Sequence, residues 1–440
     1  QISKSYDKEW PCFQYHCITD TSNQQLVAFA DNPQKAPRRQ VDTSNPLFPS
    51  GLLPDRITRN AAENPATQLV FTWRMNNSVE EGYVEYLEAT DSLNFKDQIS
   101  IQNAVLNPVP FEGITDHYFR VNIENLKPNT SYQVRVGGKE YRSEWFHVRT
   151  APQEFEPWHF IHFGGVQHFI LEYDSRIYSE AATRFPHAQF MMHSGDLVQA
   201  RGGDDDWGEF FYSGRQIFNK FPMLPAAGSS DHWERKTADS AYRVLFPQWH
   251  GIFSTPSIPP PSLKNLAYYV DYPQVRIITL YSGLEASKDY RPTYISDTLP
   301  VSEEIFMQQM EWLDNVLAQS PQKWNIVQMH HPVLSAREGR SYPSHEEVLR
   351  PILEKHRVGL VLQSHEHLFA RGISSTSDLP VYVTTPSGSR TKDWDRDAQW
   401  VQKAITQMQL YLVIFVEYDR LKVQTYSLSG NIVDEFYISD

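Results

Sequence analysis

The pattern of apolar and polar positions divides this chain into two textures. Between about residues 51 and 150, short segments alternate between apolar and polar positions, for example residues 69–73, 83–87 and 132–136. Strands of this kind, separated by turn residues, are typical of a β-sandwich. From residue 151 onward, short apolar runs such as residues 158–163 and 324–329 alternate with helical patterns. These runs predict strands that are covered on both faces, and hence an α/β unit.

Two helices can be predicted in the second half of the chain. The clearest pattern consists of apolar residues that recur at intervals of four, three and four positions: Phe306, Met310, Leu313 and Leu317. This spacing places them on one face of a helix. Further on, Ser344 and Glu347 have the spacing of a capping box, which predicts a helix that begins there and ends near His356. The last strands, from about residue 410, alternate and predict an antiparallel meander.

These textures predict an N-terminal extension over residues 1–50, a β-sandwich over residues 51–150 and an α/β domain over residues 151–440. The extension has turn formers and no clear periodicity. It also contains the two cysteines of the chain, Cys12 and Cys17. They either close a small disulfide loop in an oxidising compartment or remain two reduced thiols.

Three features favour export from the cytoplasm, to the periplasm or the extracellular space. The chain begins at Gln1 rather than Met, which is typical of a processed export product or of a trimmed chain. The asparagines of two glycosylation sequons, Asn76 and Asn129, are compatible with secretion. The cysteine pair, if oxidised, would also indicate an oxidising compartment outside the cytoplasm. We therefore expect a secreted or periplasmic protein of unknown oligomeric state.

The charge and hydrophobicity of the chain exclude two classes of protein. The formal net charge is −13, whereas proteins that bind duplex backbones do so with clustered Lys and Arg. No segment approaches the roughly 20 consecutive apolar residues that a membrane span requires. We therefore expect neither a nucleic-acid partner nor a membrane span.

Candidate metal ligands follow the predicted strands of the α/β unit. Asp196 lies just after the strand that ends at His193, and His330 follows the strand that ends at Met329. His365 and His367 follow a further strand near residue 363. Because ligands gather at the carboxyl ends of strands in such folds, we expect these side chains to converge. One carboxylate with several imidazoles is a common site for Zn, Fe or Mn.

The runs around these residues resemble the motif blocks of calcineurin-like metallophosphoesterases of the purple acid phosphatase type. The matching runs are residues 163–167, 194–199, 227–232, 327–332 and 364–367. Residues 126–132 resemble the turn and following strand of a fibronectin type III module, whose Tyr, here Tyr132, ties down the turn. The resemblance implies a fibronectin type III-like β-sandwich followed by a four-layer α/β/β/α metallophosphoesterase domain.

The resemblance also implies a two-metal site and shows where this chain departs from it. Asp196 would bridge both metals, His330 and His365 would bind one, and His367 the other. Four residues stand where the family has an Asp, a Tyr, an Asn and a His: Gly165, Gln199, Ser229 and Ser230. The site implied for the first metal therefore keeps too few ligands to compete with water.

What remains fits one metal ion. A single Zn, Fe or Mn ion can be held by Asp196, His330 and His365, with His367 nearby. The alternative is that the loss of the other ligands leaves a site that binds no metal. Asp231 and His232 are candidates to replace the missing ligand and the missing acid. His331 is a further candidate for contact with the substrate.

Two functions from different classes follow. The first is slow hydrolysis of phosphate esters, because one metal ion can still activate water but lacks the paired clamp of a two-metal site. The alternative is an inactive pseudophosphatase that binds a small-molecule ligand, a glycan or a protein partner through the inherited cleft. In that case a rim of aromatic side chains would stack on a sugar. The candidates for this rim are Trp207, Tyr212, Trp233 and Trp249. The acidic run of residues 204–206 predicts a solvated loop.

Overall fold

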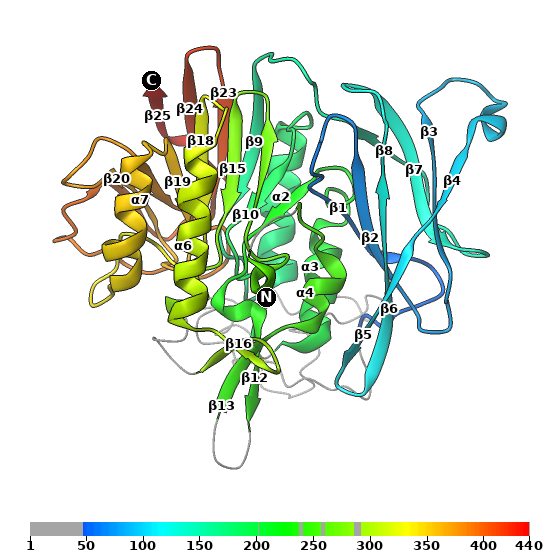
Figure 1. Cartoon of the computed structure of the whole chain (residues 1–440), viewed down its shortest axis with the longest axis horizontal. Coiled ribbons are helices and arrows are strands. Elements are labelled where there is room, and N and C mark those ends of the chain that lie inside the picture. The colour runs from blue at the N-terminus through cyan, green and yellow to red at the C-terminus, as the bar shows by residue number, and fades with distance from the viewer. Residues whose placement is uncertain (1–46, 201, 237–240, 257–259, 286–291, 440) are drawn as a thin grey trace, which may run out of the picture.

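The computed structural model describes residues 47–200, 202–236, 241–256, 260–285 and 292–439. Most of the predicted extension, including Cys12 and Cys17, lies outside these residues. The strands of the N-terminal part form two packed sheets and make up the right-hand portion of Figure 1. One sheet has the order β4-β3-β7-β8, and the other contributes β1-β2-β6-β5 to a larger sheet. The β-sandwich prediction is confirmed.

Alternation along a strand places one set of its side chains in the core of the sandwich. In β7 (Ser131–Gly138), Tyr132, Val134 and Val136 are buried while the residues between them are partly exposed. The remaining strands and the one short helix of this part are β1 (Asp55–Asn60), β2 (Leu69–Met75), β3 (Gly82–Glu88), η3 (Phe95–Gln98), β4 (Ser100–Asn103), β5 (Val105–Phe111), β6 (Ile114–Ile123) and β8 (Phe146–Arg149). The Tyr132 hydroxyl accepts a hydrogen bond from the backbone N–H of Lys127 at 2.9 Å, as expected of a residue that ties down the turn.

The C-terminal part is built from two sheets that pack face to face. The first contains β9 (Trp158–Phe163), β10 (Met191–His193), β11 (Met223–Pro225), β23 (Leu410–Val416), β24 (Arg420–Ser427) and β25 (Ile432–Ser439). The second contains β14 (Tyr268–Tyr272), β15 (Val275–Thr279), β18 (Trp324–Gln328), β19 (Leu360–Gln363), β20 (Phe369–Ile373), β21 (Val381–Thr384) and β22 (Val401–Ile405). Apolar side chains from both sheets form one continuous core cluster.

Helices cover the outer faces of these sheets. On the first sheet they are α2 (Ile170–Arg184), α3 (Gly203–Gly214) and α4 (Pro247–Ile252), and on the second α6 (Glu303–Ala318), η6 (His345–Leu349) and α7 (Arg350–Lys355). A small sheet and two short helices complete the chain: β12 (His232–Lys236), β13 (Ala241–Leu245), β16 (Thr293–Ser296), β17 (Leu299–Pro300), η4 (Ser229–Asp231) and η5 (Pro261–Leu263). The α/β/β/α layering is thus confirmed (Figure 1).

The two helix predictions have different outcomes. In α6 the four apolar residues at the predicted spacing are all buried, and the Ser302 hydroxyl caps the helix by accepting from the N–H of Ile305 at 3.3 Å. The capping box at Ser344 is wrong. Ser344 already has helical backbone angles, its side chain accepts no capping hydrogen bond, and a π-helical turn runs from His345 into α7. An N-cap residue needs extended backbone angles, which Ser344 lacks.

The sandwich and the α/β part share one ten-stranded sheet. Strand β1 pairs in parallel with β11, with Asn60 opposite Met223. Next to this pair, the backbone N–H of Arg59 donates to the carbonyl of Phe218 at 2.7 Å. Because backbone hydrogen bonds cross the boundary, the two parts form one hydrogen-bonded unit. No helix among the described residues is both long and apolar enough to cross a membrane.

The acidic run at residues 204–206 is not a solvated loop, so that prediction is wrong. It forms the first turn of α3, where carboxylates are favoured by the helix dipole. The Asp204 carboxylate pairs with two buried arginines of the sandwich, with Arg56 at 2.6 Å and with Arg74 at 3.0 Å. Arg74 also pairs with Asp55 at 2.6 Å and with Asp116 at 3.0 Å. These ion pairs connect the sandwich to α3.

Replacing the buried guanidinium at the centre of this network tests how much it contributes. We expect Arg74→Met to lower the free energy of unfolding by about 3–5 kcal/mol, because the change leaves the Asp116 carboxylate without its ion-pair partner and removes one of the two partners of Asp204. Urea unfolding of the full chain measures the effect. The control is Lys127→Ala, which removes an exposed pair with Glu88 and should change the stability little, because solvent screens this pair. Equal effects for both variants would contradict the prediction.

A second buried charge predicts a pH dependence of stability. Asp174 of α2 is fully buried, and neither carboxylate oxygen has a hydrogen-bond partner in the part of the chain that the structure describes. Burial, and then the charge of Glu209, raises the pKa of Asp174 well above its ordinary value. The unfolded chain releases this proton at a lower pH than the folded chain does, so Asp174 costs stability as pH rises above about 4.

We therefore expect Asp174→Asn to be more stable than the parent at pH 8, by about 1–3 kcal/mol, and the difference to shrink toward pH 4. Chemical denaturation at both pH values measures it. The matched control is Asp91→Asn at an exposed carboxylate, which should follow the parent. A difference between Asp174→Asn and the parent that does not change with pH would contradict this account.

Candidate metal centre

Asp196, His330 and His365 meet at the ends of three strands. Asp196 follows β10, His330 follows β18 and His365 follows β19. The Nε2 atom of His330 lies 3.2 Å from Asp196 Oδ1 and 3.0 Å from His365 Nδ1. Two ligands of one tetrahedral metal ion with bonds of about 2.0–2.2 Å are separated by about 3.3 Å, so both distances are close to ligand spacing.

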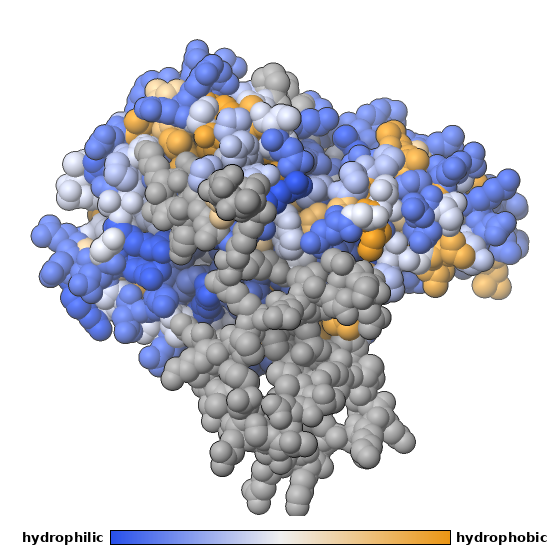
Figure 2. Space-filling model, turned by 90° about the horizontal axis from the view of Figure 1, so that it is seen from below, coloured by the Kyte–Doolittle hydropathy of each residue, from blue (hydrophilic) through white to orange (hydrophobic). Residues whose placement is uncertain are grey.

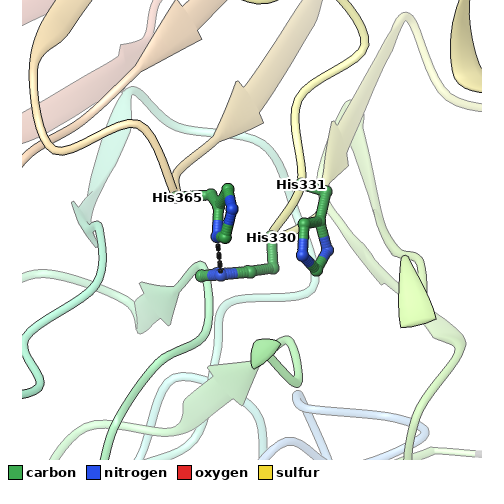
Figure 3. Close-up of side chains that lie close together, drawn as sticks. All are labelled: His330, His331 and His365. Atoms are coloured by element: carbon green, nitrogen blue, oxygen red, sulfur yellow. Dashed lines mark hydrogen bonds between the residues drawn. The ribbon is translucent and has the colours of Figure 1, made fainter. Parts of the chain in front are cut away.

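His331 joins this group, and His367 lies close enough to Asp196 and His330 to interact with their charges. The His330, His331 and His365 rings offer ligand nitrogens that all lie within 4.8 Å of one another (Figure 3). His331 Nδ1 bonds to the hydroxyl of Ser282 at 2.9 Å, and its buried Nε2 has no hydrogen-bond partner in the structure. A buried nitrogen of this kind fits a metal ligand. His367 lines the neighbouring cavity but is not part of this group.

The backbone around the group is held in conformations that most residues avoid. Asp196, His365 and His367 all have positive φ, at 56°, 72° and 57°. Gly195 has φ 79°, and a Cβ there would lie 2.8 Å from Nδ1 of His330, so no larger residue fits. Such left-handed residues are common where a fold positions a functional side chain.

A polar cavity of about 360 Å³ borders the group, and its lining is rich in cationic side chains. The cationic residues are Arg243, Arg337, Arg340, Arg390 and Lys392. The other lining residues are Gln167, His168, Asp196, Gln199, Ala200, Ser229, Ser230, His365 and His367. Asp196 is the one carboxylate among these described residues, so the cavity favours an anionic ligand. Figure 2 shows the molecule from below, where the coloured surface is mostly hydrophilic and carries scattered apolar side chains.

The surroundings of the site shift the pKa values of Asp196, His330 and His367. Burial alone would raise the pKa of Asp196, but His330 and the N–H of Ser230 outweigh it and lower that pKa. Burial opposes the charge on His330, yet the Asp196 carboxylate raises the pKa of His330 above its ordinary value. Burial, and then the charge of Arg390, lowers the pKa of His367 to about 3. His367 is thus a neutral imidazole at neutral pH.

Gln167 occupies the second oxygen of Asp196. Its Nε2 donates to Asp196 Oδ2 at 2.7 Å. A Cβ on Gly165 would lie only 3.0 Å from Gln167 Oε1 and 3.2 Å from Asp196 Cβ. An amide donor therefore contacts the oxygen that, by the family resemblance, would face the first metal. Gln167 lies in the run of residues 163–167, where Gly165 replaces the Asp of the family, but the sequence analysis did not predict this contact of Gln167.

Asp231 holds two loops together and does not line the cavity. Its Oδ2 accepts from the backbone N–H groups of Asp196 at 2.8 Å and Gly228 at 2.7 Å. Its Oδ1 accepts from Leu197 at 2.8 Å and Val198 at 3.3 Å. Burial, and then the nearby Asp196 charge, raises the pKa of Asp231 to about 7, although the backbone donors oppose the shift. This side chain has no oxygen left to replace a lost metal ligand.

His232 is also part of the scaffold. Its Nδ1 bonds to the carbonyl of Gly228 at 2.8 Å, and its Nε2 bonds to the hydroxyl of Tyr281 at 2.8 Å. Burial lowers the pKa of His232 to about 4. Because both ring nitrogens are engaged away from the cavity lining, we propose no catalytic role for His232 or Asp231.

The cationic lining was not predicted from the sequence. Arg337 and Arg340 lie on the loop between β18 and η6, and Arg390 and Lys392 follow β21. The available signal was their position: basic residues soon after strand ends, where the ligands of such folds gather. The aromatic rim, by contrast, is not formed, because Trp207 and Trp249 are fully buried.

Comparison with known proteins identifies both parts of the chain. Residues 54–150 match the family model of the purple acid phosphatase N-terminal domain. Residues 158–369 match the model of the calcineurin-like phosphoesterases. The chain belongs to the purple acid phosphatase-like metallophosphoesterase family.

Sequence relatives of this metallophosphoesterase are distant and matched only in part. It is 28% identical to purple acid phosphatase 4 of Arabidopsis thaliana over 34% of this chain and 40% of that protein. An uncharacterized protein of Mycobacterium tuberculosis is 23% identical over 73% of this chain. The match spans 63% of that relative, so the chain covers less than two thirds of either.

Solved structures agree with the fold of this purple acid phosphatase-like chain. The purple acid phosphatase PPD1 from yellow lupin seeds superposes with a TM-score of 0.70 at 16% identity, covering 89% of this chain and 75% of that one. The structure of PhoD gives 0.62 at 13% identity, covering 92% and 94%. At these identities the likeness describes the fold alone.

The contacts of Asp231 predict a large effect of an isosteric change. In Asp231→Asn one acceptor oxygen becomes an amide N–H₂ that faces backbone N–H groups, so two of them lose their partner. We expect the free energy of unfolding to fall by about 2–6 kcal/mol, at about 1–3 kcal/mol for each of the two buried groups left unpaired. Urea unfolding measures it. The control is Ser229→Ala, which removes a contact of 3.4 Å with Asp196 and should be nearly neutral.

Proposed function

We propose that this chain binds phosphate esters in the cationic cavity and hydrolyses them slowly with one metal ion. The observation that carries the proposal is the contact of His330 Nε2 with both Asp196 Oδ1 and His365 Nδ1 at the edge of that cavity. A carboxylate and neutral imidazoles are suitable donors for Zn, Fe or Mn, and their spacing is compatible with one ion. Family membership alone does not establish turnover.

The residues that we propose to hold the ion are Asp196, His330 and His365, with the buried Nε2 of His331 as a further donor. His367, included by the resemblance, lines the cavity and stays a candidate for contact with the ligand. When bound, a single ion lowers the pKa of a water molecule and polarises a phosphoryl oxygen.

The chain itself supplies binding and orientation. Arg337, Arg390 and Lys392 line the cavity, and guanidinium groups form paired hydrogen bonds with phosphate oxygens. The N–H of Ser230 is already used, because it donates to Asp196 Oδ1 at 2.6 Å. Among the described lining residues, Asp196 is the one carboxyl group, and it is engaged, so the departing alkoxide has no carboxylic acid to protonate it. Turnover should therefore be slow.

The alternative is an inactive member that binds a phosphorylated ligand without turnover. The contact of Gln167 with Asp196 Oδ2 favours it, because this amide occupies the oxygen that a second metal would need. A glycan ligand has less support, since Trp207 and Trp249 are buried rather than available for stacking. Nothing in the described residues favours a particular protein partner.

We also propose that the chain is exported from the cytoplasm. Support comes from the two sequons, since both lie at turns of the sandwich. Asn129 is exposed and Asn76 is partly exposed. Glycosylation requires a surface position, which both asparagines have.

Metal analysis with phosphatase assays tests the proposed function. We expect the purified chain, supplied with Zn, Fe or Mn, to bind one ion and to hydrolyse a phosphomonoester or phosphodiester slowly. His330→Ala should lose both the ion and the turnover, because His330 contacts both other donors. The control His356→Ala removes a surface imidazole paired with Asp314 and should change neither.

The outcomes separate the two functions. One bound ion with turnover that depends on His330 supports the hydrolase. Binding of a phosphorylated ligand without turnover under all three metals supports the inactive member. A visible tyrosinate-to-iron absorption band would contradict the alignment at Gln199, because that residue stands where the family has its Tyr.

A further inference from the structure

Arg340 contacts the outer nitrogen of a proposed metal ligand. It lies on the loop between β18 and η6 and lines the cationic cavity. Its Nη1 donates a hydrogen bond to Nε2 of His365. The other nitrogen of the same ring, Nδ1, faces His330 Nε2 at 3.0 Å. His365 therefore lies between a fixed cation and the histidine group.

Residues behind Arg340 fix the direction of this hydrogen bond. Nη1 of Arg340 also donates to the hydroxyl of Tyr342 at 3.2 Å. That hydroxyl in turn donates to Glu366 Oε1 at 3.0 Å, and Glu366 Oε2 accepts from Ser335 at 2.8 Å. Tyr342 and Glu366 are fully buried. The guanidinium is thus held in place by a buried chain of hydrogen bonds.

The donor on Arg340 determines which nitrogen of His365 carries the proton. A guanidinium has five N–H donors and no acceptor, and it keeps its charge in proteins. His365 Nε2 must therefore present its lone pair to Arg340, which places the single proton of the neutral ring on Nδ1. A metal ion needs the lone pair of the nitrogen that it binds. With Arg340 in place, Nδ1 of His365 carries the proton and has no lone pair to offer a metal ion on the side of His330.

We propose that Arg340 is a positioning residue that holds His365 in the tautomer opposed to metal binding, so that the ion binds only when the guanidinium leaves Nε2. This inference rests on the proposed function, because it concerns the same single-metal site. Metal-binding histidines in proteins usually donate their outer N–H to a carboxylate or carbonyl, which favours the metal-binding tautomer. Arg340 offers a donor where such a site has an acceptor.

The same contact connects the ligand to the metal. A phosphate group in the cavity offers Arg340 acceptors that are charged and paired, and these compete well with a neutral imidazole nitrogen. When the guanidinium turns to the phosphate, Nε2 of His365 is free to carry the proton. Binding of the phosphate and binding of the ion then favour each other, because each needs Arg340 away from His365.

Zinc affinity of the full-length protein, measured by competition with a chromogenic chelator at fixed pH, tests the inference. Arg340→Gln replaces the donor by a side chain whose Oε1 can accept from the outer N–H of His365. We expect it to raise zinc affinity on the order of 10- to 100-fold, the usual effect of an outer partner of a ligating His. Arg340→Lys keeps a donor without an acceptor and should stay within about threefold of the parent.

A second control separates the hydrogen bond from the general charge of the cavity. Arg337→Gln removes a cation from the same loop and the same cavity, but among the described residues the guanidinium that bonds to His365 is that of Arg340. It should also stay within about threefold of the parent. A gain for Arg337→Gln equal to that of Arg340→Gln would overturn the inference, because charge alone would then account for both.

A spectroscopic measurement does not depend on metal binding. Nitrogen NMR of the metal-free protein, labelled at histidine, reports which ring nitrogen carries the proton. We expect His365 of the parent to carry it on Nδ1, with the proton moving toward Nε2 in Arg340→Gln. A parent His365 protonated on Nε2 would overturn the inference.

The outcomes also distinguish this inference from the function on which it rests. If the parent binds zinc and Arg340→Gln binds it no more tightly, the inference falls and the single-metal function stands. If neither the parent nor any variant binds Zn, Fe or Mn, the proposed single-metal function falls, and the inference falls with it.

Discussion

The site depends on one buried carboxylate that is not itself a candidate ligand. Asp231 accepts backbone hydrogen bonds from Gly228, Asp196, Leu197 and Val198, which belong to the loops after β10 and β11. These contacts fix the left-handed backbone at Asp196 and bring its side chain against His330. Without such an anchor, a strained loop of this kind would relax into a more favourable conformation.

Around this anchor, hydrogen-bond donors of the chain stand at positions that the family resemblance assigns to metal chemistry. Gln167 donates to Asp196 Oδ2, and Arg340 donates to His365 Nε2. The amide of Gln167 satisfies a carboxylate lone pair that a cation would take, and the guanidinium of Arg340 satisfies the outer nitrogen of a candidate ligand. The loss of ligands at Gly165 and Ser229 therefore need not leave buried acceptors unsatisfied, which explains how the fold tolerates a reduced site.

The features of this structure that could be predicted from the sequence are those that nearby residues determine. The strands and α6 follow from periodicity, and the placement of Asp196, His330 and His365 follows from the rule that strand ends share one edge of a sheet. The failures have non-local causes. Asp204 looked like part of a solvated loop because its partners, Arg56 and Arg74, lie about 130 or more positions away in the chain. The resemblance also suggested that Asp231 and His232 replace the missing ligand and the missing acid, but tertiary contacts direct both away from the cavity.

The orientation of polar side chains is the other quantity that sequence does not contain. The basic residues at 337 and 340 are visible in the sequence, yet only the path of their loop brings them to the same cavity as Asp196. Likewise, the sequence analysis assigned His367 to the metal and His331 to contact with the substrate. The structure places His331 within the histidine group and His367 at the cavity wall.

The pairing of β1 with β11 has a consequence for the independence of the two domains. If the sandwich were cut away, β11 would become an edge strand with unpaired N–H and C=O groups, which is a template for aggregation. The sandwich thus covers a sheet edge that would otherwise be prone to aggregation. The phosphoesterase part of this chain therefore depends on the sandwich for its solubility. A version without the sandwich would expose the β11 edge of its central sheet.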